Sequence, residues 1–240
     1  MASTRGAYGW GQGERANAPG YFHGELLRNP TLLGTMNGSM TWIQVSFWHC
    51  NFAALSSDGE VYIWGSHGVD GSESVPTRVE ALVGIKIVKM KCGWSHMLAL
   101  SEDGKLFTWG TNRNAQLGRL DDFLSPKMVA AALKDEVVVD IAPCFAVTAS
   151  GSVFSWGPHA ITGDDFVFEP VMVRGFGTKH FVVSISASMF YHSACVTREG
   201  ELFTWGYGTH GMLGHGNDED HRHSPKLVEA FRGVRCKQVS

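Results

Sequence analysis

The residues best suited to bind a metal ion lie near the end of the sequence, where imidazoles alternate with carboxylates. They are His210, His215, Asp218, Glu219, Asp220, His221 and His223. Imidazole nitrogens and carboxylate oxygens are ordinary ligands of zinc and other divalent ions. The stretch has no cysteine and no strict ligand spacing, so we expect a solvated polar loop that contacts proteins, and no metal site.

The cysteines could also do chemistry, and they stand at Cys50, Cys92, Cys144, Cys195 and Cys236. No two of them are separated by two residues, the spacing typical of zinc knuckles and thiol redox centres. We therefore expect small buried thiols on strands.

Motifs of covalent catalysis are missing from the sequence. It has no glycine-rich phosphate loop, no Gly-x-Ser-x-Gly elbow and no paired-carboxylate motif in a predicted helix. The sequence predicts neither hydrolysis nor redox chemistry, so we expect no cofactor and no enzyme.

The elements that would position side chains in this chain form a repeat. The pair Trp-Gly occurs at Trp10–Gly11, Trp64–Gly65, Trp109–Gly110, Trp156–Gly157 and Trp205–Gly206, with spacings of 54, 45, 47 and 49 residues. Glycine and a short apolar strand precede the last four pairs. A fixed period of this kind is the signature of a repeat architecture in which neighbouring units share a core.

A proline followed three residues later by an aliphatic residue marks each unit a second time. These prolines are Pro30, Pro76, Pro126, Pro170 and Pro225. The distance from proline to the next tryptophan is nearly constant, at 30–35 residues, whereas the distance from tryptophan to the next proline varies from 12 to 20. Since burial sets strand length and register, the constant half predicts packed scaffold, and the variable half predicts surface loops.

One unit, from Pro76 to Gly110, illustrates the expected strands. We predict a short strand over 79–82, an alternating strand over 85–90, a buried strand over 97–100 and a last strand over 106–109. An Asp-Gly turn joins the last two. About four strands in a ~50-residue unit are typical of a propeller blade.

The motif Gly-x-x-His, an aliphatic run and Asp-Gly-x-Val/Leu-Tyr/Phe-x-Trp-Gly resembles the repeat of the regulator-of-chromosome-condensation family. Gly93 and His96 begin one copy, and the strings 109–118 and 205–216 resemble its other half. The resemblance implies an all-β fold, a β-propeller of four-stranded blades with about five repeats present as part of a seven-bladed ring. His96 and His192 recur once per unit, so we expect them on a ring as structural residues, together with the repeated Trp-Gly pairs.

We expect a single domain over 1–240, with repeats at about 1–63, 64–108, 109–155, 156–204 and 205–240. A family ring would need about 350 residues at this period. The sequence holds just under five periods, so its last repeat would stop before the hairpin turn. The blade could be completed by a longer protein, by another chain or copy, or by closure with fewer blades.

The variable loops are the predicted binding face, because loops on a rigid scaffold carry recognition. Aromatic side chains beside carboxylates are plausible interface anchors. The candidate protein-binding residues are Phe22, Leu26, Asp121, Asp122, Phe123, Asp164, Phe166, Phe168, His215, Asp218 and Asp220. The first functional hypothesis is thus a non-catalytic scaffold or adaptor subunit, whose partners are other proteins in a larger assembly.

The resemblance also implies an alternative, guanine-nucleotide exchange on a Ran-like small GTPase. The position before the repeat histidine, which is acidic in the exchange factor, holds Cys50, Ser95 and Tyr191 here. Related plant propellers sense ultraviolet light with a Gly-Trp-Arg-His motif, but the only similar string, 93–96, lacks the arginine. We therefore do not expect photoreception.

Composition narrows the remaining partner classes. The formal net charge is −3 and there is no basic tail, which argues against a nucleic-acid partner. No apolar run reaches the ~18 residues of a membrane span, and the N-terminus has no secretory pattern. We expect an intracellular protein, cytoplasmic or nuclear, with no membrane insertion.

Overall fold

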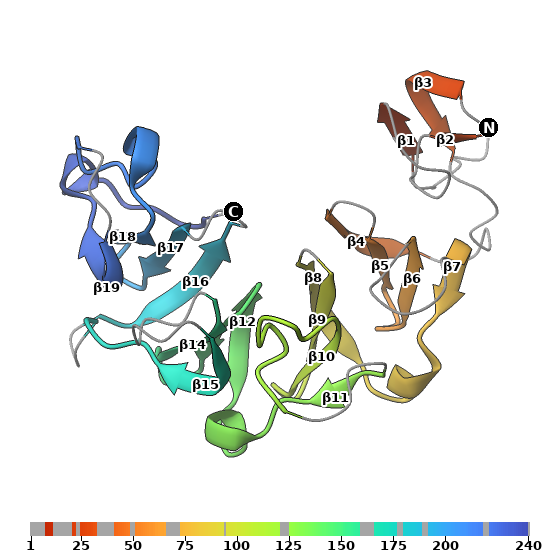
Figure 1. The fold of residues 1–240 in the computed structure, drawn as a ribbon, viewed down its shortest axis with the longest axis horizontal. Coiled ribbons are helices and arrows are strands. Elements are labelled where there is room, and N and C mark those ends of the chain that lie inside the picture. Colours follow the sequence, from red (N-terminus) through yellow and green to blue (C-terminus); the bar gives the residue numbers. More distant parts are fainter. Residues whose placement is uncertain are drawn as a thin grey trace.

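The structure is a computed structural model, and it describes residues 8–11, 21–22, 25–32, 41–48, 51–65, 73–93, 95–120, 125–158, 166–176, 180–188, 192–217 and 221–239. These residues form antiparallel sheets that follow one another around an open centre (Figure 1). Four of the sheets have four strands each, joined in sequence order. The predicted all-β fold with four-stranded blades is confirmed, while the seven-bladed ring and the repeat boundaries stay predictions.

We number the four-stranded sheets as blades 1 to 4. Blade 1 contains β4 (Trp42–Trp48), β5 (Asn51–Ser56), β6 (Val61–Gly65) and β7 (Glu73–Arg78). Blade 2 contains β8 (Ile87–Cys92), β9 (His96–Ser101), β10 (Leu106–Gly110) and β11 (Lys127–Met128). Blade 3 contains β12 (Val138–Ala142), β13 (Phe145–Thr148), β14 (Val153–Gly157) and β15 (Val167–Met172). Blade 4 contains β16 (Val182–Ala187), β17 (His192–Thr197), β18 (Leu202–Gly206) and β19 (His221–Leu227).

The remaining elements are a sheet near the N-terminus and four short turns. The sheet has the order β1-β3-β2, from β1 (Tyr8–Gly11), β2 (Tyr21–Phe22) and β3 (Glu25–Leu32). The 3₁₀ turns are η1 (Glu80–Leu82), η2 (Ala131–Leu133), η3 (Thr209–Gly211) and η4 (Glu229–Phe231).

The hydrophobic cores lie between consecutive blades, because each sheet is apolar on both faces. Trp109, Trp156 and Trp205 are almost completely buried, each in a different inter-blade core. These three tryptophans are therefore core residues, as the period predicted. Burying a large aromatic side chain stabilises a fold by about 1.5–3 kcal/mol, so each of the three anchors its blade to a neighbouring one.

The first strand of each blade lines the centre, since β4, β8, β12 and β16 contact one another in succession (Figure 1). The third residue of β4, β8 and β12 reaches across to the next blade. The Gln44 amide donates to Met90 O over 2.6 Å and accepts from Met90 N–H over 3.0 Å. At the same position in blade 3, the Asp140 carboxylate accepts from Ile185 N–H over 2.9 Å.

Asp140 also binds its neighbour on the other side. Its buried carboxylate forms an ion pair with Lys89 of blade 2 and accepts from Ile141 N–H over 2.8 Å. One carboxylate thus links the inner strands of blades 2, 3 and 4. A buried charge is tolerated when it is paired and hydrogen-bonded, as this one is.

The glycine of each tight turn is held against the next blade. Gly151 has φ +80°, in the left-handed region that side chains disfavour, and a Cβ placed there would lie 2.6 Å from Cγ of Phe181. The turns of blades 1 and 2 meet the next blade in the same way, at Gly59 with Lys86 and Gly104 with Val137, and the turn of blade 4 meets the segment after η4, at Gly200 with Arg235. The turn needs glycine for its backbone conformation and for this close approach.

The Gly-x-x-His motif has a packing explanation. A Cβ on Gly93 would lie 2.0 Å from Cε1 of His96, so the imidazole occupies the space a larger residue would need. His96 pairs with Gly110 across β9 and β10, and His192 pairs with Gly206 across β17 and β18. Both histidines thus stand opposite the glycine of a Trp-Gly pair, which supports their predicted structural role.

The prolines mark the outer edge of each blade. Pro76, Pro170 and Pro225 lie within β7, β15 and β19, and Pro126 directly precedes β11. These fourth strands are edge strands. Proline has no N–H to offer, and prolines on edge strands discourage pairing with another chain.

The prediction of a strand over 79–82 is wrong, because this segment forms the 3₁₀ turn η1. Leu82 N–H donates to Val79 O over 3.0 Å, and Leu82 is buried. The chain must cross here from the outer strand of one blade to the inner strand of the next. A turn makes that crossing while still burying one apolar residue. The turn η2 repeats this with Leu133 buried, whereas η4 forms the same turn without a buried residue.

Candidate functional site

Blade 3 carries a strip of exposed apolar side chains on its outer strand. Phe166, Phe168 and Met172 are 47%, 40% and 58% exposed. Phe168 and Met172 lie in β15, whose pairing with β14 shifts in register between Val167 and Val171, and Phe166 comes just before this strand. Val173, directly after it, points into the core between blades 3 and 4. We call Phe166, Phe168 and Met172 the rim strip.

The rim strip has an apolar neighbour in the preceding linker. β15 contacts η2, where Ala131 and Ala132 are exposed. Exposed apolar surface that gathers in one place is more informative than single exposed residues, which are normal on any protein.

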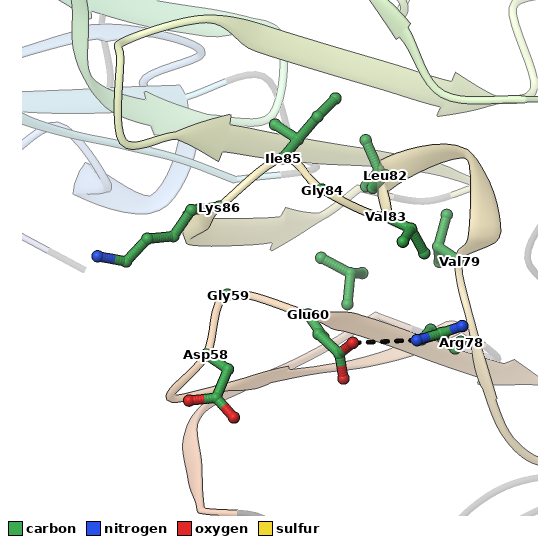
Figure 2. A pocket seen from close by; sticks show the side chains of 11 residues that line it. Asp58, Gly59, Glu60, Arg78, Val79, Leu82, Val83, Gly84, Ile85 and Lys86 are labelled. Carbon is green, nitrogen blue, oxygen red and sulfur yellow. Dashed lines mark hydrogen bonds and ion pairs between the residues drawn. The ribbon is translucent and has the colours of Figure 1, made fainter.

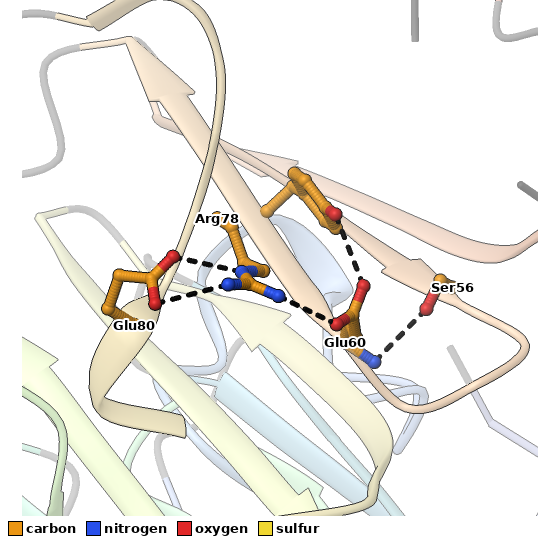
Figure 3. A network of polar contacts seen from close by, with 5 residues as sticks. Ser56, Glu60, Arg78 and Glu80 are labelled. Carbon is orange, nitrogen blue, oxygen red and sulfur yellow. Dashed lines mark hydrogen bonds and ion pairs between the residues drawn. The ribbon is translucent and has the colours of Figure 1, made fainter. Parts of the chain in front are cut away.

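In blade 1 the position equivalent to Met172 is occupied by a charged residue that forms ion pairs. Val79, Val129, Val173 and Val228 each donate their N–H to the third strand of their own blade, so the residues before them are structurally equivalent. In blade 1 that residue is Arg78, whose guanidinium binds Glu80 over 2.9 Å and Glu60 over 3.1 Å (Figure 3).

The network in blade 1 extends inward along the hairpin. Tyr62 donates its hydroxyl to Glu60 over 3.2 Å, and Glu60 N–H donates to Ser56 Oγ over 3.0 Å. Hydrogen bonds to Glu80 and then Glu60 raise the pKa of the Arg78 guanidinium. Burial, and then the hydrogen bond to Glu60, raise the pKa of Tyr62. The outer surface of blade 1 is therefore polar and satisfied.

Blade 3 lacks the arginine and both carboxylates of that network at the equivalent positions. The positions of Glu60, Arg78 and Glu80 hold Ser152, Met172 and Arg174. The other blades hold different combinations, which are Lys105, Met128 and Ala130 in blade 2 and Glu201, Leu227 and Glu229 in blade 4. The chemistry of these three positions thus differs from blade to blade.

A pocket of about 250 Å³ lies between blade 1 and the linker to blade 2, and Figure 2 shows its lining. Asp58 and Glu60 line one side, and Val83 and Lys86 the other. A counterpart of about 180 Å³ lies at the same repeat position of blade 4, between the turn at Gly200 and the segment after η4. Because the pocket recurs with the repeat, we attribute it to blade geometry.

The structure brings only part of the predicted binding set together. Phe166 and Phe168 lie on the rim strip, and sequence reasoning missed Met172 beside them. His215 is half-buried on blade 4, where its Nε2 lies 3.1 Å from Thr204 Oγ1. Phe22 and Leu26 lie in β2 and β3. Asp121, Asp122, Phe123, Asp164, Asp218 and Asp220 lie outside the described residues.

Neither a metal site nor a membrane-spanning helix occurs among the described residues. No three histidine, cysteine or acidic side chains there gather as a metal site. No helix in the same part of the chain is long and apolar enough to cross a membrane.

The cysteine thiols differ in how deeply they are buried, and this predicts a measurable difference in their reactivity. Burial raises the pKa of Cys92 to about 12, and it raises the pKa values of Cys144 and Cys195 as well. Cys236 is partly exposed. Because the thiolate is the reactive form, about 10⁻⁴ of a thiol with a pKa of about 12 is ionised at pH 8.

We expect iodoacetamide at pH 8 to alkylate Cys236 well before Cys92, Cys144 and Cys195. Labelling of the buried thiols should rise with pH, and become complete when urea unfolds the chain. Peptide mapping by mass spectrometry reads each site separately. Equal rates at Cys236 and Cys144 in the native protein would contradict the packing described here.

Comparison with known proteins identifies the repeat. The family described as "Regulator of chromosome condensation (RCC1) repeat" matches residues 58–100 and 199–240, and a second description of the same repeat matches 87–116 and 182–211. The chain is 34% identical over 251 residues to the ultraviolet-B receptor UVR8 of Arabidopsis thaliana, covering 96% of this chain and 56% of the receptor. It is 30% identical over 211 residues to the human E3 ubiquitin-protein ligase HERC2, covering 78% of this chain and 4% of the ligase.

Solved structures share the fold. Human WBSCR16 superposes with a TM-score of 0.81 at 23% identity, over 95% of this chain and 62% of that one. Yeast RCC1 (Prp20), solved in complex with Kap60, superposes with a TM-score of 0.73 at 21% identity, over 92% and 56%. The chain therefore spans little more than half of the plant receptor and a small part of the ligase.

Proposed function

We propose that this chain, which belongs to the regulator of chromosome condensation repeat family of β-propellers, is a non-catalytic protein-binding module that acts as a scaffold or adaptor subunit. The rim strip carries the proposal. Its large side chains are exposed, whereas blade 1 has an ion-pair network at the equivalent position. We place its action inside the cell, in the cytoplasm or the nucleus.

The size of the strip is suited to a binding anchor. Fully burying a large apolar side chain is worth about 1.5–3 kcal/mol. The three rim residues are roughly half exposed, so covering them would contribute on the order of 2–4 kcal/mol before the costs of association. A cluster of two aromatic side chains and a methionine has the composition of interface cores.

The experiment replaces the strip and follows the partners. In affinity purification of the tagged protein, we expect the combined Phe166→Ser, Phe168→Ser and Met172→Ser variant to lose proteins that the unmodified chain retains. The exposed side chains contribute little to the core, so the variant should keep its circular dichroism spectrum. Met128→Ser changes the equivalent residue of blade 2 and serves as the control. Retention of the same proteins by the triple variant would refute the proposal.

Guanine-nucleotide exchange on a Ran-like small GTPase is the alternative function. Family membership favours it, and yeast RCC1 (Prp20) is among the structural relatives. The acidic residues that we associate with it, Asp121 and Asp122, follow the exposed Leu120 in the loop before β11. If the chain accelerates release of a fluorescent guanine nucleotide from the GTPase, and Asp121→Ala with Asp122→Ala abolishes this, exchange replaces the scaffold role.

A further inference from the structure

Two buried donors at the junction of blades 3 and 4, Ser155 Oγ and Trp205 Nε1, have no hydrogen-bond acceptor among the described residues. Ser155 is 0% and Trp205 2% exposed. The Trp205 ring packs perpendicular to that of Phe145, which pairs with Ser155 across β13 and β14, so the two donors belong to one site. A buried donor without an acceptor is unfavourable, and such groups are rare in folded proteins.

The corresponding donors at the junction of blades 2 and 3 are both satisfied. They belong to Thr108, which also directly precedes a Trp-Gly pair, and to Trp156 of the following blade. The Thr108 hydroxyl donates to Leu117 O over 2.8 Å, and the Trp156 indole N–H donates to Gln116 O over 2.9 Å. Two consecutive carbonyls of a single turn therefore accept both hydrogen bonds.

A basic side chain completes this turn in blades 2 and 4. Arg119 donates from Nε to Thr108 Oγ1 over 3.3 Å. In blade 4 the Thr204 hydroxyl donates to Leu213 O over 2.6 Å, and it lies 3.1 Å from Nε2 of His215. Both turns share the sequence Leu-Gly followed by arginine or histidine.

The sequence between β14 and β15 of blade 3, residues 158–166, contains no Leu-Gly pair and no arginine. We propose that a turn of another protein, carrying Leu-Gly followed by arginine or histidine, binds at the junction of blades 3 and 4. Its consecutive carbonyls accept from Ser155 and Trp205, and its basic side chain donates to Ser155 Oγ. The inference goes beyond the proposed function, because it concerns a second site away from the rim strip.

Binding requires the partner turn to replace the groups that shield the two donors from solvent. The exchange is favourable because the turn offers two acceptors to donors that have none among the described residues. The junction of blades 1 and 2 offers less, since Trp109 Nε1 is also unpaired there but Ile63 stands in place of the hydroxyl residue. The pair of donors thus distinguishes blade 3 from the other described blades.

NMR spectroscopy of the full chain with isotope-labelled tryptophan tests the inference. The probe is a cyclic peptide with the sequence of residues 111–120, which includes the turn of blade 2. We expect it to move the Trp205 indole N–H signal toward that of the hydrogen-bonded Trp156. Ser155→Ala should weaken binding about tenfold. Ser150→Ala removes an exposed hydroxyl from the hairpin turn of the same blade and should leave binding unchanged.

Urea unfolding of the free chain gives a second readout. Because Ser155 Oγ has no described partner, Ser155→Ala should leave the unfolding midpoint unchanged or raise it. Thr108→Ala should lower the midpoint, because Leu117 O loses its donor. Equal losses in the two variants would show that Ser155 is already satisfied and would overturn the inference.

Three results in the NMR experiment would each overturn the inference: no binding of the peptide, a stationary Trp205 signal, or equal affinity for Ser155→Ala and the unmodified chain. A Trp205 signal that matches Trp156 in the free chain would mean that the chain supplies its own acceptor, which also refutes it. A signal that moves with protein concentration alone would assign the junction to a second copy instead. None of these results changes the proposed function, which the triple serine variant of the rim strip tests separately.

Discussion

Replacing Asp140 by alanine is expected to destabilise the propeller by about 2–6 kcal/mol, because the buried N–H groups of Ile141 and Ile185 both lose their acceptor, at about 1–3 kcal/mol each. The change leaves Ile185 N–H without its acceptor and Lys89 without its partner. It also breaks the only described carboxylate link between the inner strands of three blades. Urea unfolding followed by tryptophan fluorescence measures the loss, since Trp109, Trp156 and Trp205 lie in the inter-blade cores.

Two variants control the Asp140 experiment. Asp140→Asn keeps one acceptor oxygen, so its loss should be smaller, about 1–3 kcal/mol. Asp135→Ala removes an exposed carboxylate from the adjacent linker and should change stability by less than about 0.5 kcal/mol. If Asp140→Ala and Asp135→Ala unfold at the same urea concentration, the cross-blade linkage described here does not contribute to stability.

A second large effect is expected for Gly151→Ala, compared with Gly84→Ala. Both glycines have nearly the same left-handed backbone, with φ +80° and +86°. Forcing alanine into this region costs about 1–2 kcal/mol at either site. Only Gly151 has a neighbour in the way, the Phe181 ring, whereas nothing lies within 4 Å of the Cβ position at Gly84.

The difference between the two variants measures the contact between blades 3 and 4. Overpacking typically adds about 1–3 kcal/mol, so Gly151→Ala should be the less stable variant by that amount in thermal or urea unfolding. Equal losses would mean that the turn of blade 3 does not press against Phe181. Because the two backbone costs cancel, the comparison does not depend on their absolute size.

The blade architecture followed from the sequence because burial repeats with the chain. Each period must bury one tryptophan between sheets and turn one hairpin tightly, and few residue types satisfy either demand. The residue types of Trp109, Trp156 and Gly151 therefore recur at fixed positions of the repeat, and the sequence alone identifies them. The turn that follows Val79 could not be recognised in this way. The chain can cross between blades as a strand or as a turn, and apolar residues fit either conformation.

The candidate site was predicted less well from the sequence, because its chemistry lies in differences between repeats. Phe166 and Phe168 could be predicted from the sequence, because they are aromatic residues in a variable loop. Met172 looked like one more apolar strand residue, and its meaning comes only from alignment with Arg78 of blade 1. Asp140 was hidden for a related reason, since its partners Lys89 and Ile185 lie 51 and 45 residues away in the chain.

Site-specific photo-crosslinking tests the central claim most directly. A benzoylphenylalanine placed at position 168 of the tagged protein in cells would lie on the rim strip, and one at position 128 would lie on the outer strand of blade 2. A protein-binding rim predicts a discrete crosslinked partner from position 168 that is missing from position 128 and disappears when Met172→Ser is added. Crosslinks that are absent at 168, or identical at the two positions, would contradict the claim that blade 3 binds a partner through its rim.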